Sequence, residues 1–193
     1  TLRILPVLAL IQLSLLGKPF HIYSPSSKQN TLWIVKAIPK GESLKLEVAE
    51  KVKFDFSGRV ITAHPSKPLL YVTATGGDPG KVPGAVVFLN KDGSYLKHQN
   101  INFNDGACFL SLDKENRHIL GVSYGNGRLN VYPLDDQGIP GKAVTTIDEG
   151  KKEAHCVLLP PDGKNVYIPY VKGNLAILQY AYDGNTGKVT PLE

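Results

Sequence analysis

Short apolar stretches alternate with polar turns along the chain from about residue 20 onward, and no amphipathic helical pattern is found there. Three segments, 61–72, 111–122 and 158–169, align without gaps. Each holds a polar turn, a basic residue and then an apolar strand. These anchor strands end near residues 72, 122 and 169, and a degenerate fourth copy ends near 22, which gives steps of 47 to 50 residues.

The rest of each unit repeats as well. After the anchor strand we expect a second strand, over residues 32–38, 85–89, 129–134 and 175–180. A glycine-bearing turn follows, at Gly41, Gly93, Gly138 and Gly184, where glycine supplies the positive φ that a tight hairpin requires. Third strands are expected over 44–48, 95–100 and 143–147, and inner strands over 107–112 and 154–159 lead into the next anchors.

Four short antiparallel strands in every 47 to 50 residues are typical of a β-propeller blade. One blade cannot bury both of its faces, so neighbouring blades supply the partner surface. A β-sandwich would also contain many short strands, but it would not repeat its own sequence at a fixed period. We therefore predict an all-β fold of propeller blades over residues 20–193, each blade a four-stranded antiparallel sheet.

The first 19 residues differ from the repeats. Arg3 precedes an apolar run over residues 4–16, which is the pattern of a secretory signal peptide. The run is too short to span a bilayer as a helix, which takes about 20 residues. A small-x-small cleavage site is absent, and the alternative is a buried strand or a helix packed on the domain. Export predicts a periplasmic or secreted protein, and the alternative predicts a cytoplasmic one.

Composition excludes several classes of protein. With 42% hydrophobic and 20% charged residues, the chain is neither disordered nor collagen-like. The net charge of +5 is not gathered into a basic tract, so we expect no nucleic-acid partner. Two cysteines, Cys108 and Cys156, cannot form a disulfide scaffold, and their apolar surroundings predict buried free thiols. The histidines lack metal-ligand spacing, and His64 and His118 fall in turns that we expect to be exposed.

Specific sequence motifs of the chain resemble those of the lactonase family of seven-bladed propellers. The stretch GACFLSLDKENRHILGVSYGNGRLNVYPLDDQGIPGKAV (106–144) carries this resemblance, as do residues 154–191 and, for the first blade, 21–48. That family includes propeller-type 6-phosphogluconolactonases and fungal carboxymuconate cyclases. The resemblance implies about four of seven blades, so we expect this sequence to be a fragment. The next blade, near residue 195, would hold the Arg and Glu that accompany the family's histidine.

His155 is the residue that the resemblance singles out. It matches a histidine that the family places at the start of an inner strand, facing the central pocket, where it would act as a base or orient the substrate. Glu153 stands where some relatives have the first residue of a His-x-His pair, and would act as an acid or base beside His155. From the residues alone, a satisfied core histidine and a solvated strand end remain the alternatives.

Four further residues are candidates for substrate binding. Ser123 and Tyr124 match a position where the family often has Asn-Tyr, and Lys172 falls in the corresponding loop one blade later. With Arg128, they could meet a sugar hydroxyl or a phosphate, although ordinary loop residues are the alternative. The chain departs from the family's Gly-Pro-Cys/Thr-His pattern at residues 106–109, where Phe109 replaces a polar group.

The expected function is hydrolysis of a sugar lactone, with 6-phosphogluconolactone as the substrate that the resemblance implies. Such a reaction needs a base to activate water and a cation or N–H group for the developing oxyanion. We expect no cofactor, metal or membrane span. The alternative is an exported, non-catalytic propeller that binds a partner protein or a glycan.

Overall fold

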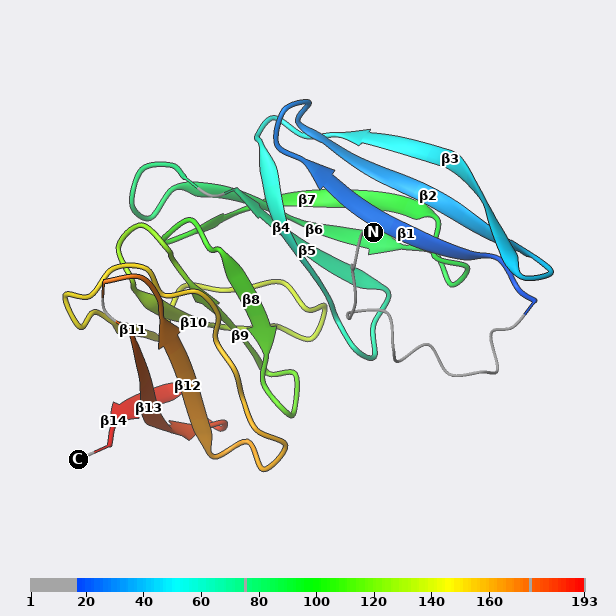
Figure 1. The fold of residues 1–193 in the computed structure, drawn as a ribbon. Helices are drawn as coiled ribbons and strands as arrows, with labels where there is room; N and C mark the ends of the chain where they lie inside the picture. Colours follow the sequence, from blue (N-terminus) through cyan, green and yellow to red (C-terminus); the bar gives the residue numbers. More distant parts are fainter. Residues whose placement is uncertain (1–16, 75, 174, 193) are drawn as a thin grey trace.

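The computed structural model describes residues 17–74, 76–173 and 175–192. The predicted signal-like run at residues 4–16 lies outside this part of the chain. The described residues form fourteen β-strands in four antiparallel sheets, which confirms the prediction of all-β propeller blades (Figure 1). No helix long and apolar enough to cross a membrane occurs among them.

Within each sheet the strands pair in chain order. The first sheet contains β1 (Phe20–Ser26), β2 (Thr31–Lys40) and β3 (Ser43–Lys53). The second contains β4 (Gly58–Ala63), β5 (Leu69–Ala74), β6 (Val82–Leu89) and β7 (Tyr95–Phe103). The third contains β8 (Phe109–Leu112), β9 (His118–Val122), β10 (Leu129–Pro133) and β11 (Thr145–Ile147). The fourth contains β12 (Asn165–Tyr170), β13 (Ala176–Asp183) and β14 (Lys188–Pro191).

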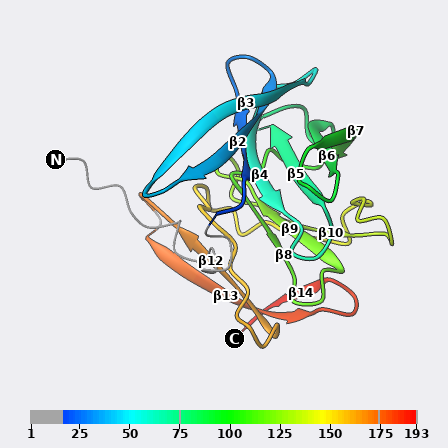
Figure 2. The same ribbon diagram turned by 90° about the vertical axis from the view of Figure 1, so that its right-hand side faces the viewer.

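The four sheets follow one another along an arc (Figure 2). Strand β4 contacts both β1 and β8, and β11 contacts β14, so each sheet touches the next. The buried apolar residues form two clusters. One lies among the first three sheets, and the other joins the third sheet to the fourth. The core is therefore made between blades, because a single four-stranded sheet cannot bury either of its faces.

Tyrosine hydroxyls join neighbouring sheets at the hairpin turns. Tyr23 on β1 donates to the carbonyl of Gly93 at 2.6 Å, and Tyr71 on β5 donates to the carbonyl of Gly138 at 2.9 Å. Both glycines have the positive φ that the repeat pattern predicts, 86° and 85°. In the last turn that conformation belongs to Gly187 and not to Gly184, because the turn is longer there and closes between the N–H of Gly187 and the carbonyl of Asp183.

The inner strand predicted over residues 154–159 is not a continuous strand. Only two isolated bridges, Ala154 with Tyr170 and Leu158 with Tyr167, link this segment to β12. The segment contains one more residue between the bridges than β12 does, so it bulges. Pro169 is the physical cause on the β12 side, since it accepts from the N–H of His155 at 3.0 Å but has no N–H to return.

Exposed large apolar side chains gather on the two end sheets. On the first sheet they are Ile22, Leu44, Leu46 and Val48, and near β13 they include Leu175 and Ile177. The long outer strand β3 is exposed over nearly its whole length.

His64 lies in the turn between β4 and β5, whereas His118 is the first residue of β9, and both are buried, 6% and 4% exposed; this corrects the expectation that both lie in exposed turns. Each imidazole packs against another aromatic side chain: His64 lies beside the ring of Tyr71, and His118 lies edge-on to Tyr182 of the next sheet. The Nδ1 of His64 accepts from the backbone N–H groups of Ser66 and Lys67 at 3.2 and 3.1 Å. Burial, and then the charge of Lys67, lower the pKa of His64 below its ordinary 6.5.

This lowered pKa predicts a loss of stability in mild acid. The unfolded chain binds a proton near pH 6.5 that the folded chain resists, so the His64 contribution is complete above that pH and is lost as pH falls below it. The variant His64→Asn should retain the turn, since asparagine accepts from backbone N–H groups two and three residues ahead. Urea unfolding from pH 7.5 to 5 should therefore show a steeper loss in the native chain than in His64→Asn. Parallel profiles would contradict the assignment.

Candidate functional site

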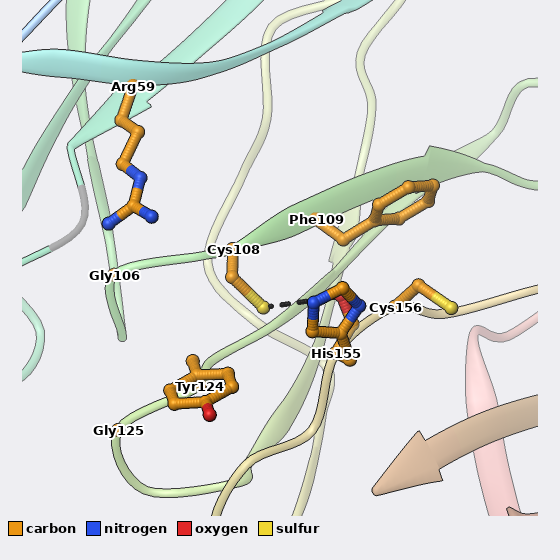
Figure 3. Close-up of a pocket in the computed structure, with 8 residues that line it drawn as sticks. All are labelled: Arg59, Gly106, Cys108, Phe109, Tyr124, Gly125, His155 and Cys156. Carbon is orange, nitrogen blue, oxygen red and sulfur yellow. Dashed lines mark hydrogen bonds between the residues drawn. The ribbon is translucent and has the colours of Figure 1, made fainter. Parts of the chain in front are cut away.

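A pocket of about 850 Å³ lies where the inner edges of the second and third sheets meet the segment that leads into β12 (Figure 3). It is lined by Arg59, Gly106, Cys108, Phe109, Tyr124, Gly125, His155 and Cys156. These residues come from three successive blades. The pocket therefore exists only because the blades are placed side by side.

Three of the lining side chains occupy the same position in successive blades. In each blade a hairpin turn leads to the next strand. Five residues before the start of that turn stand Arg59, Cys108 and His155, respectively. The residues immediately before them are small and buried: Gly58, Ala107 and Ala154. Because side chains alternate across an extended chain, one residue enters the core and the next faces the pocket.

His155, the principal candidate from the sequence, faces this pocket. Its backbone is held by the bond to Pro169, while its side chain stays exposed. The imidazole stands edge-on to the ring of Tyr124, with the ring centres 6.3 Å apart and the planes at 75°. An exposed imidazole beside an aromatic ring can form a hydrogen bond with a bound molecule or water.

Glu153, Tyr124 and Lys172 come together beside His155. The Nζ of Lys172 lies 5.3 Å from the centre of the Tyr124 ring and 3.8 Å from Oε1 of Glu153. The Tyr124 hydroxyl first, and then the Glu153 carboxylate, raise the pKa of Lys172. The ammonium is therefore positioned by a carboxylate and by the ring of Tyr124, which lines the pocket.

Both charged residues of this group have strained backbones. Glu153 and Lys172 adopt φ values of 70° and 54°, in a region that residues other than glycine rarely enter. Backbone hydrogen bonds hold Glu153 there: its N–H donates to the carbonyl of Tyr124, and its carbonyl accepts from the N–H of Val171. Strain of this kind costs on the order of 1–3 kcal/mol and concentrates at functional sites.

Of the candidates from the sequence, only His155 and Tyr124 line this pocket; Glu153 and Lys172 lie beside it, and Ser123 and Arg128 lie outside it. Ser123 is buried, and its N–H donates to the carbonyl of Arg128. The Arg128 guanidinium lies 2.8 Å from Asp148 and 3.8 Å from Asp105, and these contacts raise its pKa, the bond to Asp148 most of all. Asp105 also accepts from Asn126 and Asn130. This network fixes the backbone next to Gly106 and Gly125, and so supports the rim of the pocket.

Sequence reasoning missed Arg59 as a pocket residue. No hydrogen bond or ion pair joins its side chain to another residue in the described ranges. The signal that could have found it is the repeat itself, because Arg59 stands where the next two blades have Cys108 and His155.

The thiols and Phe109 also line the pocket. Cys108 and Cys156 are free thiols as expected, but they are half-buried where full burial was predicted. The thiol of Cys108 donates to the carbonyl of Ala154 at 3.1 Å, and burial raises the pKa of both thiols. Raised pKa values make them poor nucleophiles at neutral pH. No cluster of three metal-ligating side chains is found in residues 17–74, 76–173 and 175–192.

Residues 25–193 match the family model described as "Lactonase, 7-bladed beta-propeller". The chain belongs to this lactonase family. The resemblance to the lactonase family, inferred from the motifs around Gly106 and His155, is thus confirmed.

Two relatives of this lactonase chain carry the name 6-phosphogluconolactonase. The protein from Cronobacter sakazakii is 28% identical over 173 residues, which cover 88% of this chain and 48% of the relative. The one from Klebsiella pneumoniae is 26% identical over 171 residues, covering 88% and 49%. The chain therefore spans about half the length of the curated relatives it matches.

Among solved structures, the periplasmic gluconolactonase of Pseudomonas aeruginosa is similar in fold to this lactonase chain. The TM-score is 0.73 at 14% sequence identity, and the match covers 90% of this chain and 53% of the other. At that identity the likeness bears on the fold alone.

Proposed function

We propose that the protein hydrolyses a sugar lactone in the pocket that His155 faces. One observation carries the proposal: among the lining residues in the described part of the chain, His155 alone carries an imidazole, the side chain that acts most often as a general base. Membership of the lactonase family supports the reaction class.

The chemistry would proceed by attack of water on the lactone carbonyl. His155 would take a proton from the water as its oxygen bonds to the carbonyl carbon, giving a tetrahedral oxyanion. Lys172 would stabilise that negative charge, with Tyr124 and Glu153 keeping its ammonium in place. Collapse of the intermediate breaks the ring C–O bond, and the leaving oxygen recovers the proton from His155. Lactone and water thus give one hydroxy acid, with no oxidant or reductant needed.

For the substrate, we propose 6-phosphogluconolactone. The support is that the relatives from C. sakazakii and K. pneumoniae are named for that lactone. An unphosphorylated gluconolactone is the second candidate, because the similar structure from P. aeruginosa is named for it. Both lactones would present the same ester group to His155.

Proton release at constant pH tests this proposal directly. The purified chain is given 6-phosphoglucono-δ-lactone or glucono-δ-lactone, and base uptake is compared with the spontaneous rate in buffer and with heat-denatured protein. We expect saturable acceleration, with the higher kcat/KM for the phosphorylated lactone. Rates equal to the spontaneous ones, combined with saturable binding of a sugar, would support the non-catalytic alternative instead.

A further inference from the structure

The pocket contains the permanent positive charge of Arg59, and no lining residue that the structure describes forms an ion pair with it. Among the described residues that line the pocket, Arg59 is the one arginine or lysine, and none is an aspartate or glutamate. Arg59 is exposed, and its guanidinium makes no ion pair or hydrogen bond within the described part of the chain. By contrast, Arg128 is held by two carboxylates.

Arg59 also approaches the pocket from a different element than the proposed reacting groups. Its side chain extends from β4 toward the pocket, whereas Tyr124 follows β9 and His155 precedes β12 (Figure 3). A sugar ring seated at Tyr124 and His155 could therefore present a substituent to Arg59. Phe109, which lines the pocket from β8, offers such a substituent no hydrogen bond.

The chemistry of the guanidinium defines that substituent. Arginine offers a planar fork of N–H donors, which matches the paired oxygens of a phosphate or a carboxylate. A neutral hydroxyl would use one donor and leave the charge uncompensated. None of the described lining residues offers Arg59 a carboxylate, so an anion is the ligand group that fits its guanidinium.

We infer that Arg59 binds an anionic substituent of the substrate, a phosphate or a carboxylate, and thereby selects charged over neutral sugars. The inference rests on the proposed function for the identity of the substrate as a sugar lactone. Arg59 is assigned to recognition and not to the bond-breaking step, which we assign to His155.

Stable sugars test this role without turnover. Calorimetric titration of the chain with glucose, glucose 6-phosphate and glucuronate compares the same ring with no charge, a phosphate or a carboxylate. We expect the charged sugars to bind at least tenfold more tightly than glucose, with a preference that weakens as salt increases. The two charged sugars distinguish a phosphate site from a carboxylate site.

The variant Arg59→Gln should lose about ten- to a hundredfold in affinity for the preferred charged sugar and leave glucose binding unchanged. Arg59→Lys, which keeps the charge but not the fork, should lose less. Arg117→Gln is the matched control, because Arg117 is an exposed arginine that does not line this pocket. Equal losses for glucose and the charged sugar, an unchanged affinity, or no preference for charged sugars in the native chain would each overturn the inference.

Lactone hydrolysis separates this inference from the proposed function. Charge-selective binding through Arg59 without lactone hydrolysis would leave the anion site standing and remove the proposed reaction. Hydrolysis with the same KM for 6-phosphoglucono-δ-lactone in the native chain and in Arg59→Gln would do the reverse. If both hold, Arg59→Gln should raise KM for the phosphorylated lactone and leave KM for glucono-δ-lactone unchanged.

Discussion

Replacing His155 by glutamine is expected to lower kcat for lactone hydrolysis by about 10²- to 10⁴-fold, the range that a general base contributes. Glutamine keeps much of the volume and one hydrogen-bonding end of the side chain, but it cannot accept a proton. Because His155 is exposed and its backbone bond to Pro169 remains, folding should be preserved and KM should change little. The measurement is proton release at constant pH, corrected for spontaneous hydrolysis.

The pH profile provides the readout that separates a base from a positioning residue. A general base makes kcat depend on pH, so the pH dependence of kcat in the native chain should be absent from His155→Gln. His98→Gln is the matched control, because His98 lies on β7, bonds to Tyr95 and does not line the pocket. A native kcat and pH profile in His155→Gln would remove His155 from the mechanism.

Replacing Gly127 by alanine is expected to destabilise the fold by about 2–5 kcal/mol, from the left-handed backbone and from overpacking together. Gly127 has a φ of 75°, and its added methyl group would overlap the carbonyl of Lys151. The Gly127 carbonyl also accepts from the Tyr170 hydroxyl at 3.0 Å, so movement of this turn disturbs the contact with the fourth sheet. Urea unfolding measures the change in free energy.

Gly125 provides the control within the same turn. It has no positive φ, and a methyl group there would meet nothing within 4 Å, so Gly125→Ala should change stability by less than about 0.5 kcal/mol. The shift of residues 151–152 in Gly127→Ala should also move His155, which follows them closely. Catalytic loss in the folded fraction of Gly127→Ala is therefore expected together with the loss of stability. Equal unfolding midpoints for the two variants would contradict this account.

Most of the fold could be predicted because the repeat fixes strand order as well as strand position. The apolar runs predict where β5, β9 and β12 lie, and the polar turns predict how they pair. The inner strand at 154–159 could not be predicted correctly. Its regular pairing is interrupted because Pro169, on the neighbouring strand β12, has no N–H to donate. Nor could the burial of His64 and His118 be predicted, because a polar stretch of sequence carries no sign that another aromatic side chain will pack against it.

The residues of the candidate site could be predicted only in part from the sequence. His155 and Tyr124 could be placed by their resemblance to the family, and the structure brings Lys172 and Glu153 beside them. Arg59 lies about one hundred residues earlier in the chain than His155, and only the packing of three blades brings both to one pocket. Cys108 and Cys156 were predicted to be buried because apolar neighbours do not reveal which face of a strand end points inward.

The shared position of Arg59, Cys108 and His155 has a consequence for how such a protein can change over evolutionary time. Each of the three blades contributes one side chain that faces the pocket, an arginine, a cysteine or a histidine, while the buried residue before it is small. Substitution at one of these positions can therefore alter what the pocket recognises without enlarging or emptying the core. The pocket-facing residue of each blade can therefore be substituted independently, and ligand preference can change one blade at a time.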